Sequence, residues 1–388
     1  MSKMIRLAII TTHPIQYYAP VFELLHQRQQ LEIKVYYTWG EASETKFDPG
    51  FGKTISWDIP LLKGYSYTFL ENTADNPGSH HYRGIVNPTL IDQINEWKPN
   101  AILIYGWAYQ SHLKAIYYFK NKVPVFFRGD STLLDEENGI KKIVKSIFLK
   151  WIYKQVDYVF YVGRNNKDYY KKYGLKENQL IFAPHAIDNE RFGEEKGEET
   201  ILFRRKLGIP DNNILILFAG KIEEKKSPLL LLEAFLELKK PGVHLLFLGN
   251  GILEQRVKEI AKNKNCVHFI DFQNQSSMPV AYQACDLFCL PSKGPGETWG
   301  LAVNEAMACG RAVLVSDKVG CAIDLVQKDY NGEIFKNENR NDLVNCLDKL
   351  TRSKKQLQLY GQNSKTIIKD WSFLKIAEAI EGKINEQI

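Results

Sequence analysis

The sequence has no long apolar segment, and it lacks the signatures of several large classes of protein. No stretch approaches the roughly 20 apolar residues of a membrane-spanning helix, and the opening run MSKMIRLAIITTHP is short and ends at Pro14. We therefore expect a first strand there, and no signal peptide. Zinc-finger spacing, an RNA-binding signature and runs of several consecutive basic residues are all missing, so nucleic acid is not an expected partner. The absence of a G-x-G-x-x-G after the first strand disfavours a nicotinamide dehydrogenase.

Cysteine is scarce and unevenly placed. All six cysteines lie in the second half of the chain, mostly in apolar segments: Cys266, Cys285, Cys289, Cys309, Cys321 and Cys346. Their sequence context offers no partners for a metal site, so we expect reduced core cysteines in a cytoplasmic protein. The formal net charge of +6 is a mild excess, which suits anionic small molecules or a membrane surface.

The length of 388 residues exceeds what one core usually holds. Apolar, strand-like runs alternate with helical segments through residues 1–192, and the alternation restarts after the charged run GEEKGEET at 193–200. Such alternation is typical of parallel sheets with helices on both faces. The sequence therefore predicts the α/β class, with two doubly wound, Rossmann-like domains over 1–192 and 200–370 that face each other across a cleft.

Residues 286–317 carry the most informative pattern. DLFCL and RAVLVSD are apolar runs typical of buried strands, and LAVNEAMAC between them is helical and stops at Gly310. The loop SKGPGETWG before this helix contains Gly294, Gly296 and Gly300, which allow close approach of a ligand to the backbone. The N–H groups of residues 298–302 then form an anion site at the helix N-terminus. The alternative is that these glycines serve only the turn.

Charged residues of both signs lie near the carboxyl ends of the strands in the second predicted sheet, where a ligand is expected to bind. Glu305 lies in an otherwise small and apolar helix, so it needs a hydrogen-bonded partner, such as the hydroxyls of a ribose; a solvent-facing glutamate is the alternative. Lys221 follows a strand and Gly220, and Lys226 begins the next helix. Two cations there can hold a diphosphate, although FAGKIEEKKSP also fits a solvated charged turn.

Together these motifs resemble the family-4 retaining glycosyltransferases, which have the GT-B fold. The family's Glu-x7-Glu motif stands here as ETWGLAVNEAMACG, beginning at Glu297 and including Glu305. Its G-(R/K)-L-x-x-x-K pattern runs from Gly220 to Lys226, its G-x-G is GNG at 249–251, and its P-S is PS at 291–292. The resemblance covers the whole second domain, whereas the first domain is similar only in architecture.

The resemblance implies a role for each matching position. Lys221 and Lys226, beside Gly220, would bind the donor's diphosphate, with the N–H groups of Gly300 and Leu301 completing the site. Glu305 would bind the ribose, residues 270–272 including Phe272 would line the base, and the catalytic Glu297 would contact the sugar hydroxyls, with Thr298 and Trp299 in the same loop. The final helix, over 371–388, would pack back on the first domain. The family needs no metal or other cofactor, and the sequence contains no Asp-x-Asp pair.

The first domain departs from the family at two places. HPIQYY, with His13 and Gln16, replaces a glycine-rich first loop and suggests a specialised acceptor or sugar pocket. Asp130 stands where many members have histidine, so we expect it to contact the transferred sugar or acceptor, with Arg128 nearby; the alternative is that these two simply pair. Trp107, directly after a strand, is a candidate for stacking on a sugar. His112 is interpreted as a structural helix residue.

The predicted function is transfer of a sugar, with retention, from a nucleotide-diphosphate donor to a carbohydrate or lipid-linked acceptor in surface polysaccharide or glycoconjugate synthesis. A nucleotide-sugar epimerase on the same fold and a non-catalytic nucleotide-sugar-binding scaffold are the alternatives. The segment 140–155 is a basic amphipathic helix. It either covers the sheet or touches the inner membrane face of the cell. The sequence leaves base, sugar, acceptor, linkage and oligomeric state open.

Overall fold

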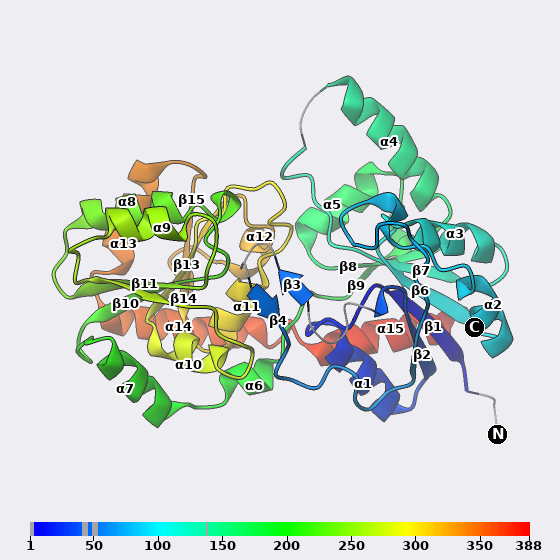
Figure 1. Cartoon of the computed structure of the whole chain (residues 1–388), viewed down its shortest axis with the longest axis horizontal. Helices are drawn as coiled ribbons and strands as arrows, with labels where there is room; N and C mark the ends of the chain where they lie inside the picture. The colour runs from blue at the N-terminus through cyan, green and yellow to red at the C-terminus, as the bar shows by residue number, and fades with distance from the viewer. Residues whose placement is uncertain (1–3, 41–45, 49–52, 137–138) are drawn as a thin grey trace. The chain divides into compact units, whose positions relative to one another are not determined.

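The computed structural model describes residues 4–40, 46–48, 53–136 and 139–388 (Figure 1). The chain forms two compact units. Unit 1 comprises Met1–Lys46, Ile59–His185 and Phe373–Ile388, and unit 2 comprises Phe47–Asp58 and Ala186–Ser372. Among the described residues, no helix is long and apolar enough to cross a membrane.

The unit 1 sheet is parallel throughout, with strand order β5-β2-β1-β6-β7-β8-β9. Its strands are β1 (Arg6–Thr11), β2 (Glu32–Tyr37), β5 (Tyr67–Phe69), β6 (Ala101–Tyr105), β7 (Val125–Arg128), β8 (Tyr158–Tyr161) and β9 (Leu180–Phe182). β6 and β7 are buried along their whole length, as expected for strands covered on both faces.

Helices cover both faces of this sheet. They are α1 (Ala19–Arg28), α2 (Leu90–Trp97), α3 (Gln110–Phe119), α4 (Ile140–Tyr153), α5 (Arg164–Lys172) and α15 (Phe373–Gln387), with short 3-10 turns η2 (Tyr82–Gly84) and η3 (Glu177–Gln179). Apolar residues of α2 to α5 form one core with the strands. The final helix α15 belongs to this unit and packs on α1, where Arg28 Nε lies 2.9 Å from Glu381 Oε2.

The unit 2 sheet is also parallel, with order β12-β11-β10-β13-β14-β15. Its strands are β10 (Ile214–Ala219), β11 (Val243–Leu248), β12 (Val267–Ile270), β13 (Leu287–Leu290), β14 (Ala312–Ser316) and β15 (Gly332–Phe335). A separate two-stranded sheet pairs β3 (Lys46–Asp48) with β4 (Lys53–Ile55). In sequence order the main sheet reads 3-2-1-4-5-6, the order of a dinucleotide-binding Rossmann fold.

The unit 2 helices lie on both faces of its sheet (Figure 1). They are α6 (Asn189–Gly193), α7 (Gly197–Lys206), α8 (Pro228–Leu238), α9 (Glu254–Ile260), α10 (Met278–Ala284), α11 (Leu301–Ala308), α12 (Ala322–Leu325), α13 (Arg340–Leu350) and α14 (Lys354–Ile368), with the 3-10 turn η4 (Glu224–Lys226). The core includes apolar residues of α8, α9, α13 and α14 with one face of the strands. Helix α8 begins with Pro228, which suits a first helical position.

The division into units differs from the expected boundary after residue 192. The main part of unit 2 begins at Ala186, and residues 197–200 of the charged run expected as a linker form the start of α7. Glu198 and Glu199 stand in its first turn and basic residues in its last, which is the favourable order for the helix dipole. Arg204 is buried and donates to the carbonyl oxygens of Ala284 (2.9 Å) and Asn213 (2.6 Å), which fixes α7 on unit 2.

Residues 47–58, expected in the first domain, also belong to unit 2. Asn274 Nδ2 donates to the carbonyl oxygen of Ser56 at 2.7 Å, and the backbone N–H of Ser276 donates to the Asp58 carboxylate at 3.2 Å. These contacts join residues more than 200 positions apart, so no local sequence pattern indicates them.

Candidate functional site

The predicted donor residues gather at the point where the unit 2 strand order reverses. β10 and β13 are neighbours there, with Ile216 opposite Leu287. Ligands of doubly wound sheets bind outside the carboxyl ends of the two strands at such a point. The loop after β10 carries Lys221 and Lys226, and the loop after β13 carries Glu297. A backbone hydrogen bond of 2.8 Å from Lys293 N–H to Lys225 O joins the two loops.

Lys226, Glu297 and Ser292 form one bonded cluster. Lys226 Nζ pairs with Glu297 Oε2, and Ser292 Oγ donates to the same oxygen at 2.8 Å. Glu297 is only 8% exposed, and the Ser292 side chain is fully buried. Ser292 is held in turn because its carbonyl oxygen accepts from Ser316 Oγ. The carboxylate expected to contact the sugar is therefore fixed by two donors on different elements.

The loop around Gly220 depends on glycine for close backbone packing. Gly249, with φ +131°, sits so near the β10 loop that a Cβ there would lie 2.1 Å from the carbonyl oxygen of Gly220. Gly251 is equally constrained by the backbone of Ile222, which donates to the Asn250 carbonyl oxygen at 2.9 Å. The G-x-G pattern thus positions the segment that carries Lys221. The Lys221 residue is half-buried.

Gly300 makes the sharp turn into α11. Its φ of +100° is left-handed, and a Cβ there would lie 2.9 Å from Val319 Cγ1. Within the described residues, no side chain caps this helix end. The N–H groups of its first turn, which begins at Leu301, therefore have no capping side chain and suit an anion. The predicted helix and its end before Gly310 are confirmed.

The loop after β14 holds this turn in place through backbone hydrogen bonds. The backbone N–H groups of Gly320 and Cys321 donate to the carbonyl oxygens of Glu297 (3.0 Å) and Trp299 (2.9 Å). A Cβ on Gly320 would lie 1.7 Å from the Thr298 carbonyl oxygen, so only glycine fits. Nothing in the sequence near Gly320 indicated this contact with residues about 20 positions earlier.

Glu305 is buried within α11, with 4% exposure, and accepts a 2.8 Å hydrogen bond from Tyr282 of α10. The solvent-facing alternative is therefore wrong. A carboxylate can accept about four hydrogen bonds, so Tyr282 uses part of its capacity. The ribose role of Glu305 stays a prediction.

The remaining donor residues differ in how they are placed. Trp299 is buried; its Nε1 donates to Asn304 Oδ1 at 2.9 Å, and its ring centroid lies 5.1 Å from that of Trp371. The Trp299 side chain is therefore part of the packed interior, whereas the Thr298 side chain is half-buried. Phe272 follows β12 and is half-buried, and its backbone N–H donates to Asn250 Oδ1 at 2.9 Å.

Asn250 is a positioning residue that sequence reasoning did not single out. Its Nδ2 donates to Asp271 Oδ1 at 3.1 Å and to Glu254 Oε2 at 3.0 Å, while its Oδ1 accepts from Phe272. The side chain is therefore bonded on both ends and joins the carboxyl ends of β11 and β12. Its position between two glycines directly after a strand was the available signal.

In unit 1, His13 and Trp107 follow the neighbouring strands β1 and β6, where that sheet's order also reverses. His13 Nδ1 lies 3.0 Å from Thr12 Oγ1, and its ring meets Trp39 edge-on at 5.6 Å. Gln16, in the same loop, is half-buried. The Trp107 ring packs against Phe148 of α4, with centroids 5.6 Å apart. Their acceptor roles stay predictions.

Arg128 and Asp130 lie in one neighbourhood, because the charges of both shift the pKa values of Tyr18, Tyr170 and His185, but their side chains have different partners. The Arg128 guanidinium is buried and donates to the carbonyl oxygens of Ala183 and Pro184, both at 2.8 Å, which joins the ends of β7 and β9. The alternative of a simple Arg128–Asp130 pair is therefore not the arrangement seen. The Asp130 side chain is 46% exposed, and its Oδ2 lies 3.9 Å from Nε2 of the buried His185.

His185 completes a cluster around Asp130 that sequence reasoning missed. Its ring stacks parallel to Tyr18 at a centroid distance of 6.3 Å. Burial lowers the pKa of His185, and the nearby Asp130 opposes that effect. Burial also raises the pKa of Tyr18, and the Asp130 charge adds to this. A neutral imidazole and a phenol thus lie beside a half-exposed carboxylate.

His112 is confirmed as a structural residue. It is fully buried on α3, with Nε2 2.8 Å from Thr38 Oγ1 and Nδ1 within 3.1 Å of the carbonyl oxygens of Tyr105 and Gly106. The two carbonyl acceptors place the proton on Nδ1. Burial lowers the pKa of His112 to about 4, so the ring is neutral at physiological pH.

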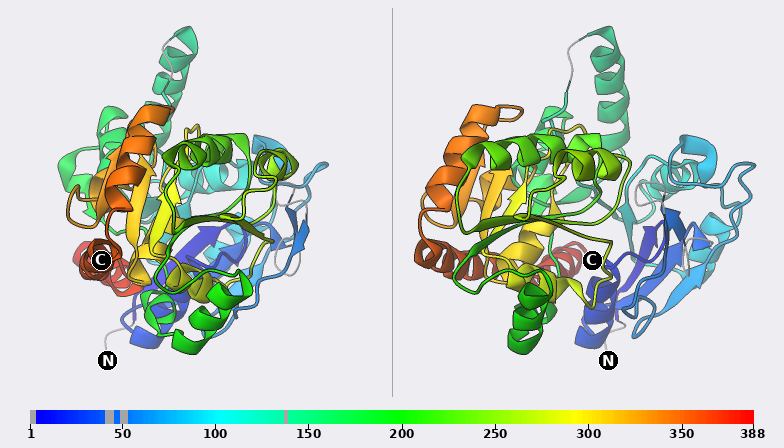
Figure 2. Two further views of the ribbon diagram at one scale, coloured as in Figure 1. Left: turned by 90° about the vertical axis from the view of Figure 1, so that its left-hand side faces the viewer. Right: turned by 60° about the vertical axis from the view of Figure 1, so that its left-hand side comes forward.

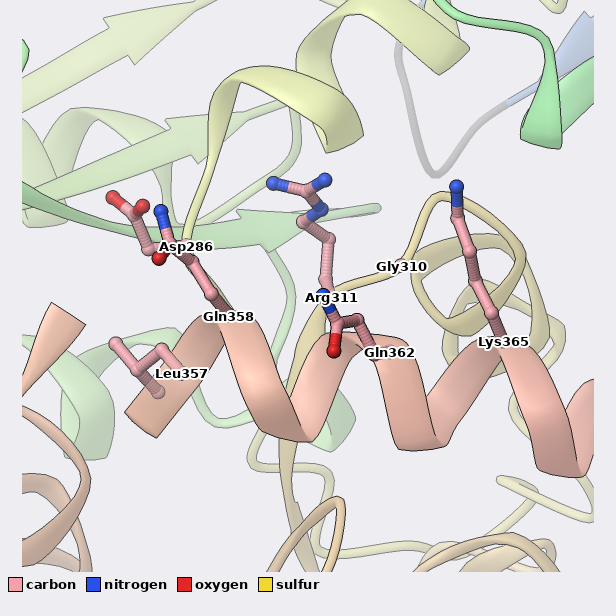
Figure 3. Close-up of a pocket in the computed structure, with 7 residues that line it drawn as sticks. All are labelled: Asp286, Gly310, Arg311, Leu357, Gln358, Gln362 and Lys365. Carbon is pink, nitrogen blue, oxygen red and sulfur yellow. The ribbon is translucent and has the colours of Figure 1, made fainter. Parts of the chain in front are cut away.

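A cavity of about 270 Å³ in unit 2 lies at the amino ends of β13 and β14, whereas the donor loops follow the carboxyl ends of their strands (Figure 3). Asp286 and Arg311 directly precede β13 and β14, and Gln358, Gln362 and Lys365 reach them from α14. Arg311 already donates to the carbonyl oxygens of Cys309 (2.8 Å) and Cys285 (2.9 Å), so its guanidinium is committed to the fold.

One segment of the chain matches the model of a known family. Residues 199–367 match the model described as Glycosyl transferases group 1. A Campylobacter jejuni N-acetylgalactosamine-N,N'-diacetylbacillosaminyl-diphospho-undecaprenol 4-alpha-N-acetylgalactosaminyltransferase is 24% identical over 62% of this chain and 63% of its own length. A D-inositol 3-phosphate glycosyltransferase of Stackebrandtia nassauensis is 29% identical over 46% of this chain and 42% of its own. The chain thus spans less than two thirds of either relative.

Solved structures share the whole architecture. Anabaena HepE in complex with UDP has a TM-score of 0.74 at 17% identity, over 99% of this chain and 100% of its own. Sucrose-phosphate synthase from Thermosynechococcus elongatus has a TM-score of 0.71 at 16% identity, over 99% of both chains. The predicted α/β class with two Rossmann-like domains is confirmed. The chain has the fold of GT-B glycosyltransferases, and its residues 199–367 match the glycosyl transferases group 1 family.

Proposed function

We propose that the protein transfers a sugar, with retention of configuration, from a nucleoside-diphosphate sugar to a hydroxyl group of a carbohydrate or lipid-linked acceptor in surface polysaccharide or glycoconjugate synthesis. The observation that carries the proposal is the cluster of Lys226, Glu297 and Ser292 beside the N-terminus of α11. It lies at the switch point of the sheet, inside the segment that matches the group 1 family.

The donor's diphosphate fits this edge electrostatically. Lys221 and Lys226 supply two positive charges, and the first-turn N–H groups of α11 supply donors that point out of the helix. Because Lys226 is paired with Glu297 in the structure, the ion pair neutralises both groups before the donor arrives. Donor binding would break this ion pair and replace it with two contacts to the donor. Lys226 would then contact phosphate, and Glu297 would contact sugar hydroxyls.

The ribose fits the buried carboxylate of Glu305. Tyr282 holds one of its oxygens, which fixes the orientation of the group before the nucleotide binds. Two adjacent ribose hydroxyls would then donate to this buried carboxylate, which can accept about four hydrogen bonds. Asn250 holds the segment that would line the base.

In the proposed reaction the acceptor hydroxyl attacks the anomeric carbon from the face that the diphosphate leaves. The new glycosidic C–O bond forms as the bond to the diphosphate oxygen breaks, and the hydroxyl proton passes to that departing oxygen. Lys221, Lys226 and the α11 N–H groups stabilise the negative charge that develops there. Asp130 would contact the sugar or the acceptor from unit 1.

Relatives support the substrate classes. The Campylobacter relative is named for a diphospho-undecaprenol substrate, and the Anabaena structures contain UDP, with glucose in one and UDP-glucose in another. Uridine diphosphate and its sugars therefore come first in a donor panel, and undecaprenyl diphosphate-linked sugars come first among the acceptors.

The test measures thermal unfolding with a panel of nucleoside diphosphates. A ligand at a hundred times its Kd should stabilise the wild type by about 2.7 kcal/mol. We expect Glu305→Ala to abolish this gain. Glu333→Ala should retain it, because Glu333 is a comparably buried glutamate whose partner is Lys349, on the β15–α13 side of the unit. If no nucleoside diphosphate stabilises the folded wild type, the proposal fails.

Turnover separates the rival functions. Transfer predicts a glycosylated acceptor and one free nucleoside diphosphate per product, with the product anomer, read by proton NMR, matching that of the donor. An isomerised donor without transfer would indicate an epimerase, and binding without turnover with any donor and acceptor pair would indicate a scaffold.

A further inference from the structure

Helix α4 has two apolar faces, and one of them is not covered. Leu149, Ile152 and Tyr153 are buried in the unit 1 core. On the other side, five large apolar side chains remain exposed by 39–66%: Ile143 62%, Val144 63%, Ile147 66%, Phe148 39% and Trp151 47%. The covering role expected of this helix therefore accounts for part of its apolar surface and leaves the rest in solvent.

The five exposed side chains form a single stripe, which we call the α4 stripe. Their spacing of one, three, one and three residues keeps them on one side of a helix with 3.6 residues per turn. Figures 1 and 2 show the N-terminal part of α4 extending away from the other helices of unit 1. A contiguous apolar patch of this kind marks an interaction surface more often than a lone exposed residue does.

The helix is anchored, so the α4 stripe has a fixed orientation within unit 1. Near its N-terminus, Lys142 Nζ lies 3.1 Å from Glu136 Oε2, and that carboxylate also pairs with Lys172 of α5. Near its C-terminus, the Trp151 ring lies 4.6 Å from the Tyr117 ring of α3. These contacts hold both ends of the helix on its own unit, and Trp151, which is itself part of the stripe, remains 47% exposed.

Lysines border the stripe. Lys145, Lys150 and Lys154 are all exposed. Helical geometry puts Lys150 and Lys154 on the Ile143 side of the stripe, whereas Lys145 projects toward the opposite face of the helix. The sequence of α4, IKKIVKSIFLKWIY, contains no acidic residue. The surface thus combines aliphatic side chains, an exposed tryptophan and positive charge.

We propose that the α4 stripe docks on the surface of an anionic phospholipid bilayer. The aliphatic side chains and Trp151 would enter the boundary between headgroups and acyl chains, while the lysines contact lipid phosphates. With 14 residues, α4 is too short to span a bilayer, and this geometry lays it in the plane of the surface. The inference does not depend on the proposed function, although such a surface suits a lipid-linked acceptor.

A second copy of the chain fits the same stripe less well. A two-fold symmetric pair would bring identical stripes together, and with them the lysines at their edges. No acidic side chain on α4 would balance that charge. An anionic bilayer, in contrast, covers the apolar stripe and contacts both Lys150 and Lys154.

The test is co-sedimentation of the full chain with vesicles of phosphatidylcholine alone or of phosphatidylcholine mixed with phosphatidylglycerol. We expect binding to the mixed vesicles that weakens as salt is raised. Lys150→Ala with Lys154→Ala should weaken binding roughly 25-fold, from about fivefold for each lysine near an anionic surface. Ile143→Ser with Ile147→Ser should weaken it roughly tenfold or more.

The matched control replaces two exposed aliphatic residues of α7 in unit 2, Ile201→Ser with Leu202→Ser, which are 42% and 54% exposed. This variant should bind vesicles like the wild type. Circular dichroism should show both serine pairs folded, because all four side chains are exposed. The proposal is overturned if the wild type ignores anionic vesicles, or if the α4 serine pair binds as well as the wild type. It is equally overturned if light scattering shows a dimer that only the α4 serine pair dissociates.

Discussion

The substitution Glu297→Gln should tighten the binding of a nucleoside diphosphate while it suppresses sugar transfer. In the structure Lys226 Nζ is paired with Glu297, so a diphosphate must compete with the carboxylate for this cation. Glutamine keeps the size and the ability to accept from Ser292 but removes the charge. The proposed exchange of partners therefore becomes easier for a ligand that carries no sugar.

The size of the effect follows from the type of hydrogen bond. Bonds to charged groups contribute about 1.5–3 kcal/mol and neutral ones about 1 kcal/mol. The difference is roughly 1 kcal/mol for a pair whose side chains are 16% and 9% exposed, which corresponds to about fivefold tighter binding. Transfer should fall roughly 100-fold or more, as for the loss of an electrostatic contact to the transition state.

Isothermal titration calorimetry with uridine diphosphate, or whichever diphosphate the panel identifies, measures the first effect, and product formation measures the second. Lys226→Met provides the opposite control, because it removes the cation and should weaken binding. Ser292→Ala keeps the charge of Glu297 and should give no gain in affinity. Equal or weaker binding by Glu297→Gln would refute the exchange of partners.

Three further substitutions test how the fold supports the site. Gly300→Ala should lower the unfolding free energy by about 2 kcal/mol, because alanine is strained at φ +100° and its Cβ would meet Val319; chemical denaturation measures this. Asn250→Ala should raise the donor KM more than it lowers kcat, since it frees the segment expected to line the base; steady-state kinetics tests the split. Burial lowers the pKa of His112 to about 4, below its unfolded value of about 6.5. Folding stability is therefore complete above pH 6.5 and falls as the pH drops toward 4, by up to roughly 3 kcal/mol; denaturation curves of His112→Gln should lack this slope.

The alternation of strands and helices was predictable because each element carries its own local signal. Parallel strands such as Ile214–Ala219 are buried throughout and read as continuous apolar runs. The helix Leu301–Ala308 was bounded by Gly300 and Gly310, whose left-handed backbones the sequence signals directly. Contacts between segments far apart in sequence had no such signal, and they include the attachment of residues 47–58 to unit 2.

The site was predictable to the extent that a residue's chemistry is visible without its partners. Glu305 stood out because a carboxylate among small apolar residues needs a bonded partner, yet the sequence could not identify Tyr282 as that partner. For the same reason Arg128 was expected near the acceptor, although a buried guanidinium can equally serve backbone carbonyls. The partners lie 23 and about 55 residues away, at distances set only by the fold.

The proposed site residues of the two units differ in burial, and this difference predicts which of them can be substituted without loss of donor binding. In unit 2 the glutamates are buried and already bonded, Glu297 to Lys226 and Ser292, and Glu305 to Tyr282. Groups held in this way need little reorganisation when a donor binds, but they also tolerate little change. Asp130 in unit 1 is half exposed, so it can be substituted with a small effect on folding. Exchanges at Asp130 should therefore change acceptor use while leaving nucleoside diphosphate affinity intact, whereas exchanges at Glu305 should remove that affinity for every acceptor.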